Sequence, residues 1–512
     1  MIEKIKTAGL GDKIRTKPSL GKELNLIFSD SAFTGRVAFN LKGAVLAFGF
    51  FLYFFVQNGT LGLFPEKWYI YYRSIRLSDL VQYTLIIYSF IKVKEYSDLF
   101  TSRSLLLPKI FLGYIVFEFF LSALNYHFDI IEYFFRLKGL WSSFLIFPFL
   151  LLLKRNGLLY LIKMIFPFAV LSNVLYIMTA LTGVAFLPDV SIYILKLPFD
   201  MTVYRVYGGT FYGEMFLIGF IYFWITKKFK FYQVFFVILF LIPHILAFGR
   251  SSWFTIAFTI SIIFAIGVYY KKNYKNVLRQ IAVISIFLLS LFIIFTNFFP
   301  DSNYLADALK ERVFQGEEDI TYNEGTYDTR VHFQTNSLIR LWLQSNIFVG
   351  VGMHPMWVVR PENYEEQVWY NAFCDVTWPA VLAAYGLIGL AIALCYQVYF
   401  IYLAAKMVLK MKEFDINTYL LTTSLCGFIF STFITYSYNL ITTGLWGFYS
   451  TNFAIAFFVY FYEKFRIEKI KDEIKQEINQ TEFIKMNGTI KKIRNKRFHA
   501  NQLFDYKKNG HS

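Results

Sequence analysis

The chain has 512 residues, of which 56% are hydrophobic and 17% charged, and its mean hydropathy is +0.45. This composition excludes an ordinary soluble enzyme and is typical of a polytopic membrane protein. The formal net charge of +16 predicts no nucleic-acid partner, because basic residues retained in cytoplasmic loops account for it.

Apolar runs of about 17–25 residues, long enough to cross a hydrocarbon core of about 30 Å, recur along the chain. We therefore predict an all-α fold of about twelve transmembrane helices with one long extracytoplasmic loop. The second and fourth runs are short and interrupted. No short apolar core with a cleavage site opens the chain, so no removable signal peptide is predicted. The predicted spans are 37–57, 77–93, 109–128, 137–153, 158–183, 210–226, 231–248, 252–270, 280–299, 377–400, 417–440 and 445–462.

Lysine and arginine gather in the N-terminal segment, in every second connection and in the tail. Cytoplasmic loops retain such residues, so both termini are predicted to be cytoplasmic. The predicted organisation is a cytoplasmic segment (1–36), nine helices (37–299), an extracytoplasmic loop (300–376), three helices (377–462) and a basic cytoplasmic tail (463–512).

The loop between Pro300 and Asp375 is the longest polar stretch between predicted spans, with twelve carboxylates against five basic side chains. Inside it, Thr329 to Gln344 has helical spacing of apolar residues, which predicts an amphipathic helix that lies on the membrane or roofs a cavity. The apolar face is expected to hold Val331, Leu338, Leu341 and Trp342. Gly350 and Gly352 then predict a turn that ends this helix.

No metal site and no disulfide are predicted. The run Glu317-Glu318-Asp319 is interpreted as a solvated acidic segment, although a divalent cation is an alternative. Of the cysteines, Cys395 and Cys426 fall in apolar spans and Cys374 stands alone near the outer face.

Ionisable residues inside apolar spans are costly and are therefore functional candidates. For Glu118 and His244 we favour a structural hydrogen bond between helices. For Glu214, which follows Arg205 and lies one turn into its span, a functional and a structural role both remain open.

Three arginines, Arg205, Arg250 and Arg330, fall at the predicted outer face. A single interfacial arginine commonly extends to lipid phosphate. Three on one face favour recognition of a pyrophosphate, because guanidinium groups bind phosphate oxygens in pairs. Asp375 falls at the outer end of its span, where it is either an N-terminal cap or a functional carboxylate.

Taken in order, these segments resemble the superfamily of bacterial O-antigen ligases and polymerases, over roughly Tyr204 to Leu390. The family's usual histidine is replaced here by Asp375, and its following asparagine by Val376. The resemblance lies in Arg205 with Gly208-Gly209, in Gly249-Arg250-Ser251, in Arg330 through Gly350-Val351-Gly352, and in Asp375 through Gly386-Leu387-Ile388-Gly389.

The resemblance implies a GT-C-like glycosyltransferase of the bacterial plasma membrane. It transfers a glycan from undecaprenyl pyrophosphate on the outer face, with inversion and with neither cofactor nor metal. Arg250 and Arg330 would bind the pyrophosphate with support from Arg205, and Asp375 or His354 would activate the acceptor. The other expected substrate-binding residues are Glu214, Arg340 and Tyr370. Implied partners are the lipid-linked glycan, an acceptor glycan or lipid, the bilayer, a chain-length regulator and a flippase.

Three functions remain open. Asp375 in place of histidine favours a polymerase of repeat units over a ligase that transfers finished glycan. A transporter of lipid-linked oligosaccharides belongs to another class, in which charged sites and broken helices lie near the bilayer midplane. Here the arginine candidates gather instead at the predicted outer face.

Overall fold

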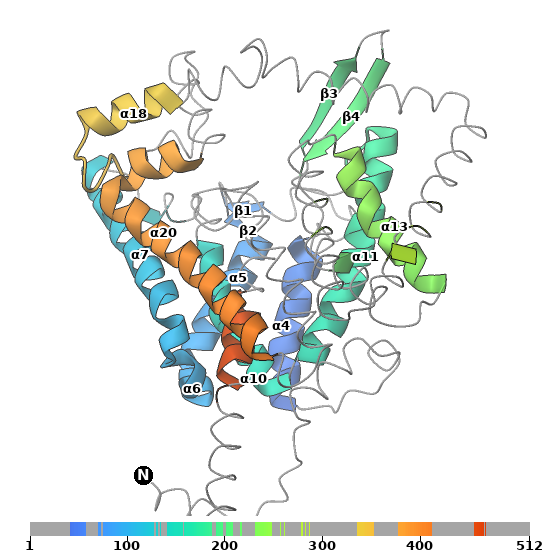
Figure 1. The fold of residues 1–512 in the computed structure, drawn as a ribbon, viewed down its shortest axis with the longest axis horizontal. Helices are drawn as coiled ribbons and strands as arrows, with labels where there is room; N and C mark the ends of the chain where they lie inside the picture. The colour runs from blue at the N-terminus through green and yellow to red at the C-terminus, as the bar shows by residue number, and fades with distance from the viewer. Residues whose placement is uncertain are drawn as a thin grey trace, which may run out of the picture. The chain divides into compact units, whose positions relative to one another are not determined.

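The computed structural model is mostly helical where it describes the chain. It describes residues 41–57, 70–72, 75–126, 130–131, 134, 141–156, 158–186, 191–197, 201–207, 216–217, 231–247, 257, 261, 278–279, 282, 286, 335–352, 377–411, 455–464 and 466. The helices named below are drawn in Figure 1. They are α4 (Leu41–Gln57), α5 (Leu77–Ile91), α6 (Ser97–Phe100), α7 (Leu106–Tyr126), α10 (Ile146–Asn156), α11 (Leu158–Thr182), α13 (Phe231–Leu246), α18 (Thr335–Gln344) and α20 (Thr377–Met411). Short 3-10 helices join some of them: η3 (Val93–Tyr96), η4 (Arg103–Leu105) and η5 (Ser142–Leu145).

Six of the long helices, α4, α5, α7, α11, α13 and α20, match predicted spans, although α20 runs eleven residues beyond the predicted end at 400. The fourth predicted span differs, because η5 precedes a helix, α10, of only 11 residues. The predicted spans 252–270, 280–299 and 417–440 lie almost wholly outside the described residues. The total of about twelve spans therefore stays a prediction.

Among the described residues, one helical stretch, Arg103–Leu124, is long and apolar enough to cross a membrane. Shorter apolar helices occur at Leu77–Ile91, Phe166–Thr182, Val234–Leu246 and Val381–Tyr396.

The short helix α10 lies at the centre of the N-terminal helices. Every side chain from Leu145 to Leu153 is buried, and α10 packs against α4, α5 and α11. The Phe149 ring stacks on the Phe50 ring of α4 at 4.8 Å between centroids. A helix that is apolar all round and buried all round is the expected core of such a bundle.

Two β-hairpins were not predicted. The larger pairs β3 (Ser191–Leu197) with β4 (Met201–Tyr207), with Tyr193 opposite Arg205. It packs on α11, where the Tyr176 hydroxyl donates a hydrogen bond to the Val206 carbonyl at 2.7 Å. Alternating aromatic and β-branched residues on either side of the sequence Pro198-Phe199-Asp200 were the signal that could have predicted this hairpin. The smaller hairpin pairs β1 (Ile70–Tyr72) with β2 (Ile75–Arg76).

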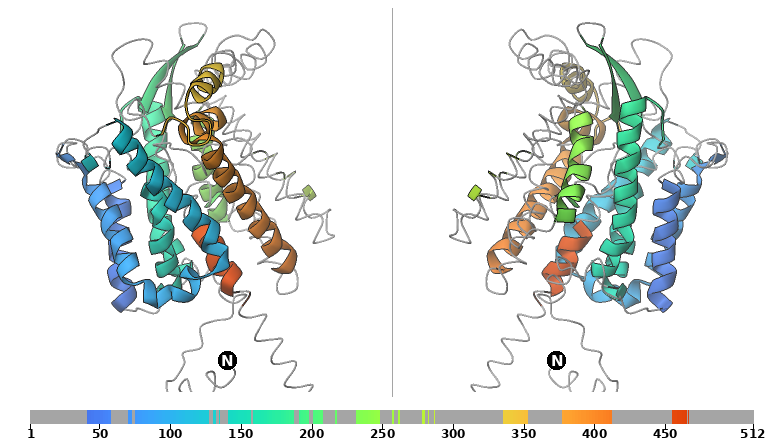
Figure 2. Two further views of the ribbon diagram at one scale, coloured as in Figure 1. Left: turned by 90° about the vertical axis from the view of Figure 1, so that its left-hand side faces the viewer. Right: turned by 90° about the vertical axis from the view of Figure 1, so that its right-hand side faces the viewer.

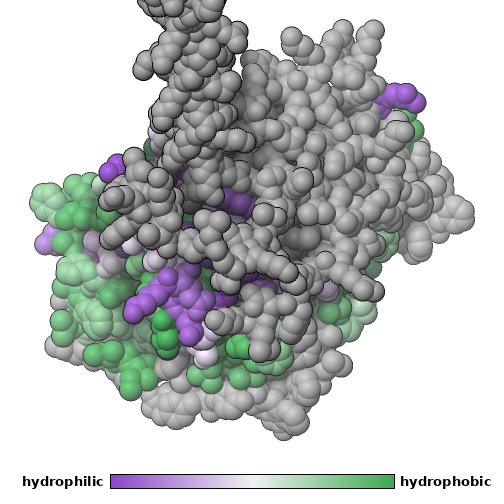
Figure 3. All heavy atoms as spheres, turned by 90° about the horizontal axis from the view of Figure 1, so that it is seen from below, coloured by the Kyte–Doolittle hydropathy of each residue, from purple (hydrophilic) through white to green (hydrophobic). Residues whose placement is uncertain are grey.

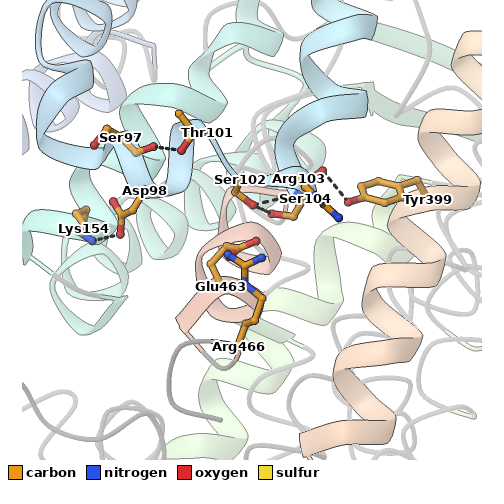
Figure 4. A network of polar contacts seen from close by, with 10 residues as sticks. All are labelled: Ser97, Asp98, Thr101, Ser102, Arg103, Ser104, Lys154, Tyr399, Glu463 and Arg466. Atoms are coloured by element: carbon orange, nitrogen blue, oxygen red, sulfur yellow. Dashed lines mark hydrogen bonds and ion pairs between the residues drawn. The ribbon is translucent and has the colours of Figure 1, made fainter. Parts of the chain in front are cut away.

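Two basic connections that were predicted to be cytoplasmic lie together at one end of the helices. Arg155, at the end of α10, donates two hydrogen bonds of 2.9 Å to the Glu95 carboxylate of η3. Its neighbour Lys154 pairs with Asp98 of α6 (Figure 4). Figure 3 looks onto this end and shows hydrophilic surface bordered by hydrophobic surface.

The 3-10 helix η3 is held at this end by a buried tyrosine. The Tyr96 hydroxyl donates to the Ser89 carbonyl at 3.1 Å, and burial raises the pKa of Tyr96 to about 12. The hydroxyl therefore stays protonated and keeps this hydrogen bond at neutral pH.

The chain divides into two compact units, Met1–Tyr460 and Phe461–Ser512. In the second unit the structure describes 461–464 and 466. There Glu463 forms an ion pair with Arg466, one helical turn away, at 2.9 Å. Pairing of opposite charges at this spacing agrees with the alternating signs of the tail sequence.

We expect the Arg155–Glu95 pair to couple measurably to stability. Two parallel hydrogen bonds on an arginine that is itself largely buried favour the upper end of the range for such pairs, about 1 kcal/mol. A double-mutant cycle with Arg155→Ala and Glu95→Ala, read from denaturant unfolding of the purified protein, measures this coupling. The same cycle with the exposed Arg103→Ala is the matched control and should give no coupling. Equal coupling in both cycles would contradict the assignment.

Candidate functional site

The amphipathic helix predicted in the long loop is present as α18. Leu338 is fully buried, Leu341 and Trp342 are partly buried, and Asn336 and Arg340 lie on the exposed side. These positions agree with the predicted apolar face, except that Val331 lies outside the described residues. The structure describes this helix from Thr335 to Gln344, and the predicted residues 329–334 lie outside the described residues.

After α18 the chain forms a tight loop, 345–352. The Trp342 indole N–H donates to the Ile347 carbonyl at 2.9 Å, and the Asn346 side chain accepts from the Phe348 N–H at 3.0 Å. Gly350 and Gly352 both have positive φ, 74° and 78°. The predicted glycine turn after this helix is therefore confirmed.

The helix α20 is broken at Gly386. This residue has φ 61° and ψ −165°, a backbone conformation that is essentially restricted to glycine. The first part of α20 accordingly turns away from the rest of the helix (Figure 1). A break inside an apolar helix leaves backbone N–H and C=O groups that need other partners.

The loop supplies those partners through four hydrogen bonds. In an uninterrupted helix the N–H groups of Leu387 and Ile388 would donate to the carbonyls of Ala383 and Ala384. Here those carbonyls accept instead from two loop N–H groups, and the two helix N–H groups donate to loop carbonyls. The bonds are Val351 N to Ala383 O (2.8 Å), Gly352 N to Ala384 O (2.8 Å), Leu387 N to Ile347 O (3.0 Å) and Ile388 N to Phe348 O (3.1 Å). We call this set of four bonds the interlock.

Glycines make this close approach possible. A β-carbon on Gly386 would come within 2.4 Å of the Phe348 carbonyl. One on Gly350 would lie 2.5 Å from the carbonyl oxygens of Ala383 and Ala384. Both distances are far below van der Waals contact, so side chains at these positions would force the loop and the helix apart.

Helix α7 completes the site from the side (Figure 2). Its Tyr114 hydroxyl donates to the Tyr385 carbonyl at the break, at 2.9 Å. Ser122, two turns further, packs against Gly352, where an added β-carbon would lie 2.5 Å from the serine oxygen. Glu118 lies between them on the same face, since residues four apart stack along a helix.

Glu118 is completely buried, with 0% of its surface exposed, and neither carboxylate oxygen has a hydrogen-bond partner among the described residues. The Tyr114 hydroxyl on the same helix lies beside the carboxyl but donates its single proton to the Tyr385 carbonyl, so it can accept a hydrogen bond only from a protonated Glu118. The structural hydrogen bond predicted for Glu118 is therefore not present in the described part of the chain. His244 is buried within α13, and the hydrogen bond to another helix that was predicted for it stays a prediction.

Most of the predicted site residues lie outside the described residues: Arg250, Arg330, His354, Asp375, Glu214 and Tyr370. The other two predicted site residues are among the described residues. Arg340 is exposed on α18, and Arg205 is a member of β4. Along the chain, His354 follows Gly352 by two residues and Asp375 precedes α20 by two.

The sequence analysis missed the contribution of α7. Tyr114, Glu118 and Ser122 are four residues apart in an apolar run, which was a signal that the three share one face. Among the described residues no group of three or more His, Cys, Asp or Glu side chains is arranged to hold a metal ion.

No protein-family model matches this chain, and no curated protein matches its sequence. The resemblance to the O-antigen ligases and polymerases therefore rests on the motifs themselves and stays a prediction.

We expect Gly386→Ala to destabilise the protein strongly. The strained backbone alone costs on the order of 1–3 kcal/mol, and the clash with the Phe348 carbonyl adds to that. Gly113→Ala is a matched control, because Gly113 lies within α7 and its added β-carbon meets nothing within 4 Å. That change should be neutral or stabilising by about 0.5–1 kcal/mol. Thermal melting of both purified variants checks the interlock, and equal melting temperatures would refute it.

Proposed function

We propose that this chain is a membrane glycosyltransferase that polymerises lipid-pyrophosphate-linked repeat units on the outer face of a bacterial plasma membrane. One observation carries the proposal. The two glycine motifs of the resemblance, Gly350-Val351-Gly352 and Gly386-Leu387-Ile388-Gly389, both take part in the interlock, each by hydrogen bonds to residues that adjoin the other motif. The motifs were identified separately in sequence, and a shared site is the simplest reason for them to meet.

The surface of α7 supports a membrane location. Five large apolar side chains form a stripe along its outer side while the opposite face is buried. A core helix of a soluble protein would bury both faces, whereas a membrane-spanning helix presents one to lipid. The exposed residues are Leu106, Ile110, Phe117, Phe120 and Leu124.

The direction of α7 supports the proposed topology. At its start, the Arg103 carbonyl accepts from the Tyr399 hydroxyl, near the basic connections (Figure 4). Near its other end, Ser122 contacts Gly352 of the acidic loop. Basic connections and acidic loop thus lie at opposite ends of one apolar helix, as expected for an inner and an outer side.

In the proposed reaction an acceptor hydroxyl attacks the anomeric carbon of the lipid-linked glycan. The bond to the pyrophosphate oxygen breaks, and the lipid pyrophosphate leaves with the electron pair. Arg250 and Arg330 are proposed to stabilise that charge, with Arg205 and Arg340 as further cations. Asp375 or His354 is proposed to take the proton of the hydroxyl. Glu214 and Tyr370 are proposed to contact the glycan.

Two other functions need to be weighed. A ligase would use the same donor with a different acceptor. A transporter is favoured by one observation, since broken helices and buried carboxylates such as Glu118 are typical of transport sites. Yet in transporters the freed ends of broken helices serve the substrate, whereas here the loop occupies them. That difference supports the enzyme.

Deleting the gene and separating surface polysaccharide and lipid-linked intermediates on gels tests the function. A polymerase predicts single repeat units in place of the ladder. Arg250→Ala and Arg330→Ala should reproduce that pattern, because losing one such cation costs about 10²–10³ in rate. Finished polymer retained on its lipid carrier would instead establish a ligase, and an unchanged ladder would exclude both.

Arg340 offers a test on a described residue. We expect Arg340→Ala to shorten the ladder, because this exposed cation of α18 is one of the proposed substrate-binding residues. Asn336→Ala, one turn earlier on the same exposed side, is the matched control and should leave the ladder unchanged. Identical ladders from the two variants would remove Arg340 from the site.

Topology is tested independently of activity. In a chain whose own cysteines are replaced, Gln344→Cys on α18 and Lys94→Cys in η3 each introduce one exposed thiol. A membrane-impermeant maleimide should label Gln344→Cys in intact cells and Lys94→Cys only after permeabilisation. Labelling of both in intact cells, or of neither, would contradict the proposed orientation.

A further inference from the structure

The buried Glu118 carboxyl needs a neutralising partner. Removing an ionised carboxylate from water without one costs far more than folding can supply. Glu118 lies inside the apolar stretch Arg103–Leu124 and is fully buried. It must therefore carry a proton or bind a cation.

The basic side chains of α7 and η4 are not that partner. Lys109 is nine residues earlier, roughly 13 Å along the helix. Its amine donates to the Phe100 carbonyl and lies 3.7 Å from the centre of the Phe100 ring. Arg103 is further away still, and exposed. Among the described residues, no cation accompanies the Glu118 carboxylate.

The surroundings of Glu118 suit a positive ion. The first part of α20 ends at the break, and the carbonyl end of a helix carries partial negative charge. Tyr114 and Ser122, one turn on either side of Glu118, add hydroxyl oxygens on the same face. Carboxylate and hydroxyl oxygens are ligands that hard cations accept. The carbonyls at the break already accept from the loop and from Tyr114, so the break contributes its partial negative charge and not a ligand.

We propose that Glu118 is a binding site for a monovalent cation, a proton or Na⁺, and that its occupancy stabilises the interlock. Ser122 and Tyr114 connect the site to the interlock, because they contact Gly352 of the loop and Tyr385 beside the break. The empty, charged site would draw in water and loosen these contacts. The proposal goes beyond the glycosyltransferase function and does not depend on it.

The groups around Glu118 leave it the principal titrating side chain of the site. From α20 the ionisable neighbours of α7 are Tyr385, whose ring contacts Tyr114, and Tyr396, whose ring stacks on Phe111. Loop residues 346–352 contain no ionisable side chain. Phe134 and Trp141, which contact Phe119, contain none either. An ordinary tyrosine loses its proton only near pH 10, so below about pH 9 none of these neighbours changes charge.

Thermal melting of the full-length protein in detergent is the first test, in Na⁺ or choline buffers between about pH 6 and about pH 9. A proton site predicts a melting temperature that falls by a few degrees as pH rises, equally in both salts. A sodium site predicts that Na⁺, but not choline, restores the higher melting temperature at high pH. In Glu118→Gln, a neutral isostere, the melting temperature should depend neither on pH in this range nor on Na⁺. Asp79→Asn, at another buried carboxyl on α5, is the matched control and should keep the wild-type dependence. A Glu118→Gln variant that responds like wild type overturns the proposal.

A second measurement uses the wild-type protein, so that its outcome does not depend on whether a variant folds. Dicyclohexylcarbodiimide reacts with protonated carboxyls in apolar sites, and mass spectrometry locates the adduct. A proton site predicts that the rate of Glu118 modification falls as pH rises and does not change with Na⁺. A sodium site predicts protection by Na⁺. Absence of modification at Glu118 at every pH, without Na⁺, would also overturn the proposal.

Discussion

The interlock is the constraint on which the rest of the site depends. A helix cannot break within an apolar environment unless every freed backbone group finds another partner, because water is not there to supply one. In α20 the break at Gly386 frees two carbonyls and two N–H groups, and the loop satisfies all four. Loop and helix are therefore joined at this point, and each satisfies backbone groups of the other.

This dependence determines what surrounds the interlock. The loop approaches so closely that Gly350 and Gly386 have no room for side chains, and α7 must present a small residue, Ser122, under Gly352. A third carbonyl near the break, that of Tyr385, is satisfied by the Tyr114 hydroxyl of α7. The long acidic loop is thereby attached to the helix bundle at a fixed point, and the chain segments that carry His354 and Asp375 adjoin that point in sequence.

The sequence was informative where a single physical rule dominates. Bilayer thickness determines the length of apolar runs, so α7 and α11 could be predicted within a few residues. Helical periodicity likewise predicted the apolar face of α18. The break at Gly386 could not be predicted, because glycines such as those of Gly-Leu-Ile-Gly are common in membrane helices. The loop that satisfies the break also lies about 35 residues earlier in the sequence. The environment of Glu118 depends on the same long-range contact and was missed for the same reason.

The interlock also bears on whether such a site transports or catalyses. A transporter must open and close around its substrate, so the ends of its broken helices remain available to ligands. A glycosyl transfer between two lipid-anchored chains needs instead a rigid floor that holds donor phosphate and acceptor in fixed orientation. Four backbone hydrogen bonds close the break from within, which agrees with the proposed enzyme better than with a transporter. Glu118 lies on α7 between Tyr114 and Ser122, which contact the break and the loop, so the proposed occupancy of Glu118 is expected to appear first in stability.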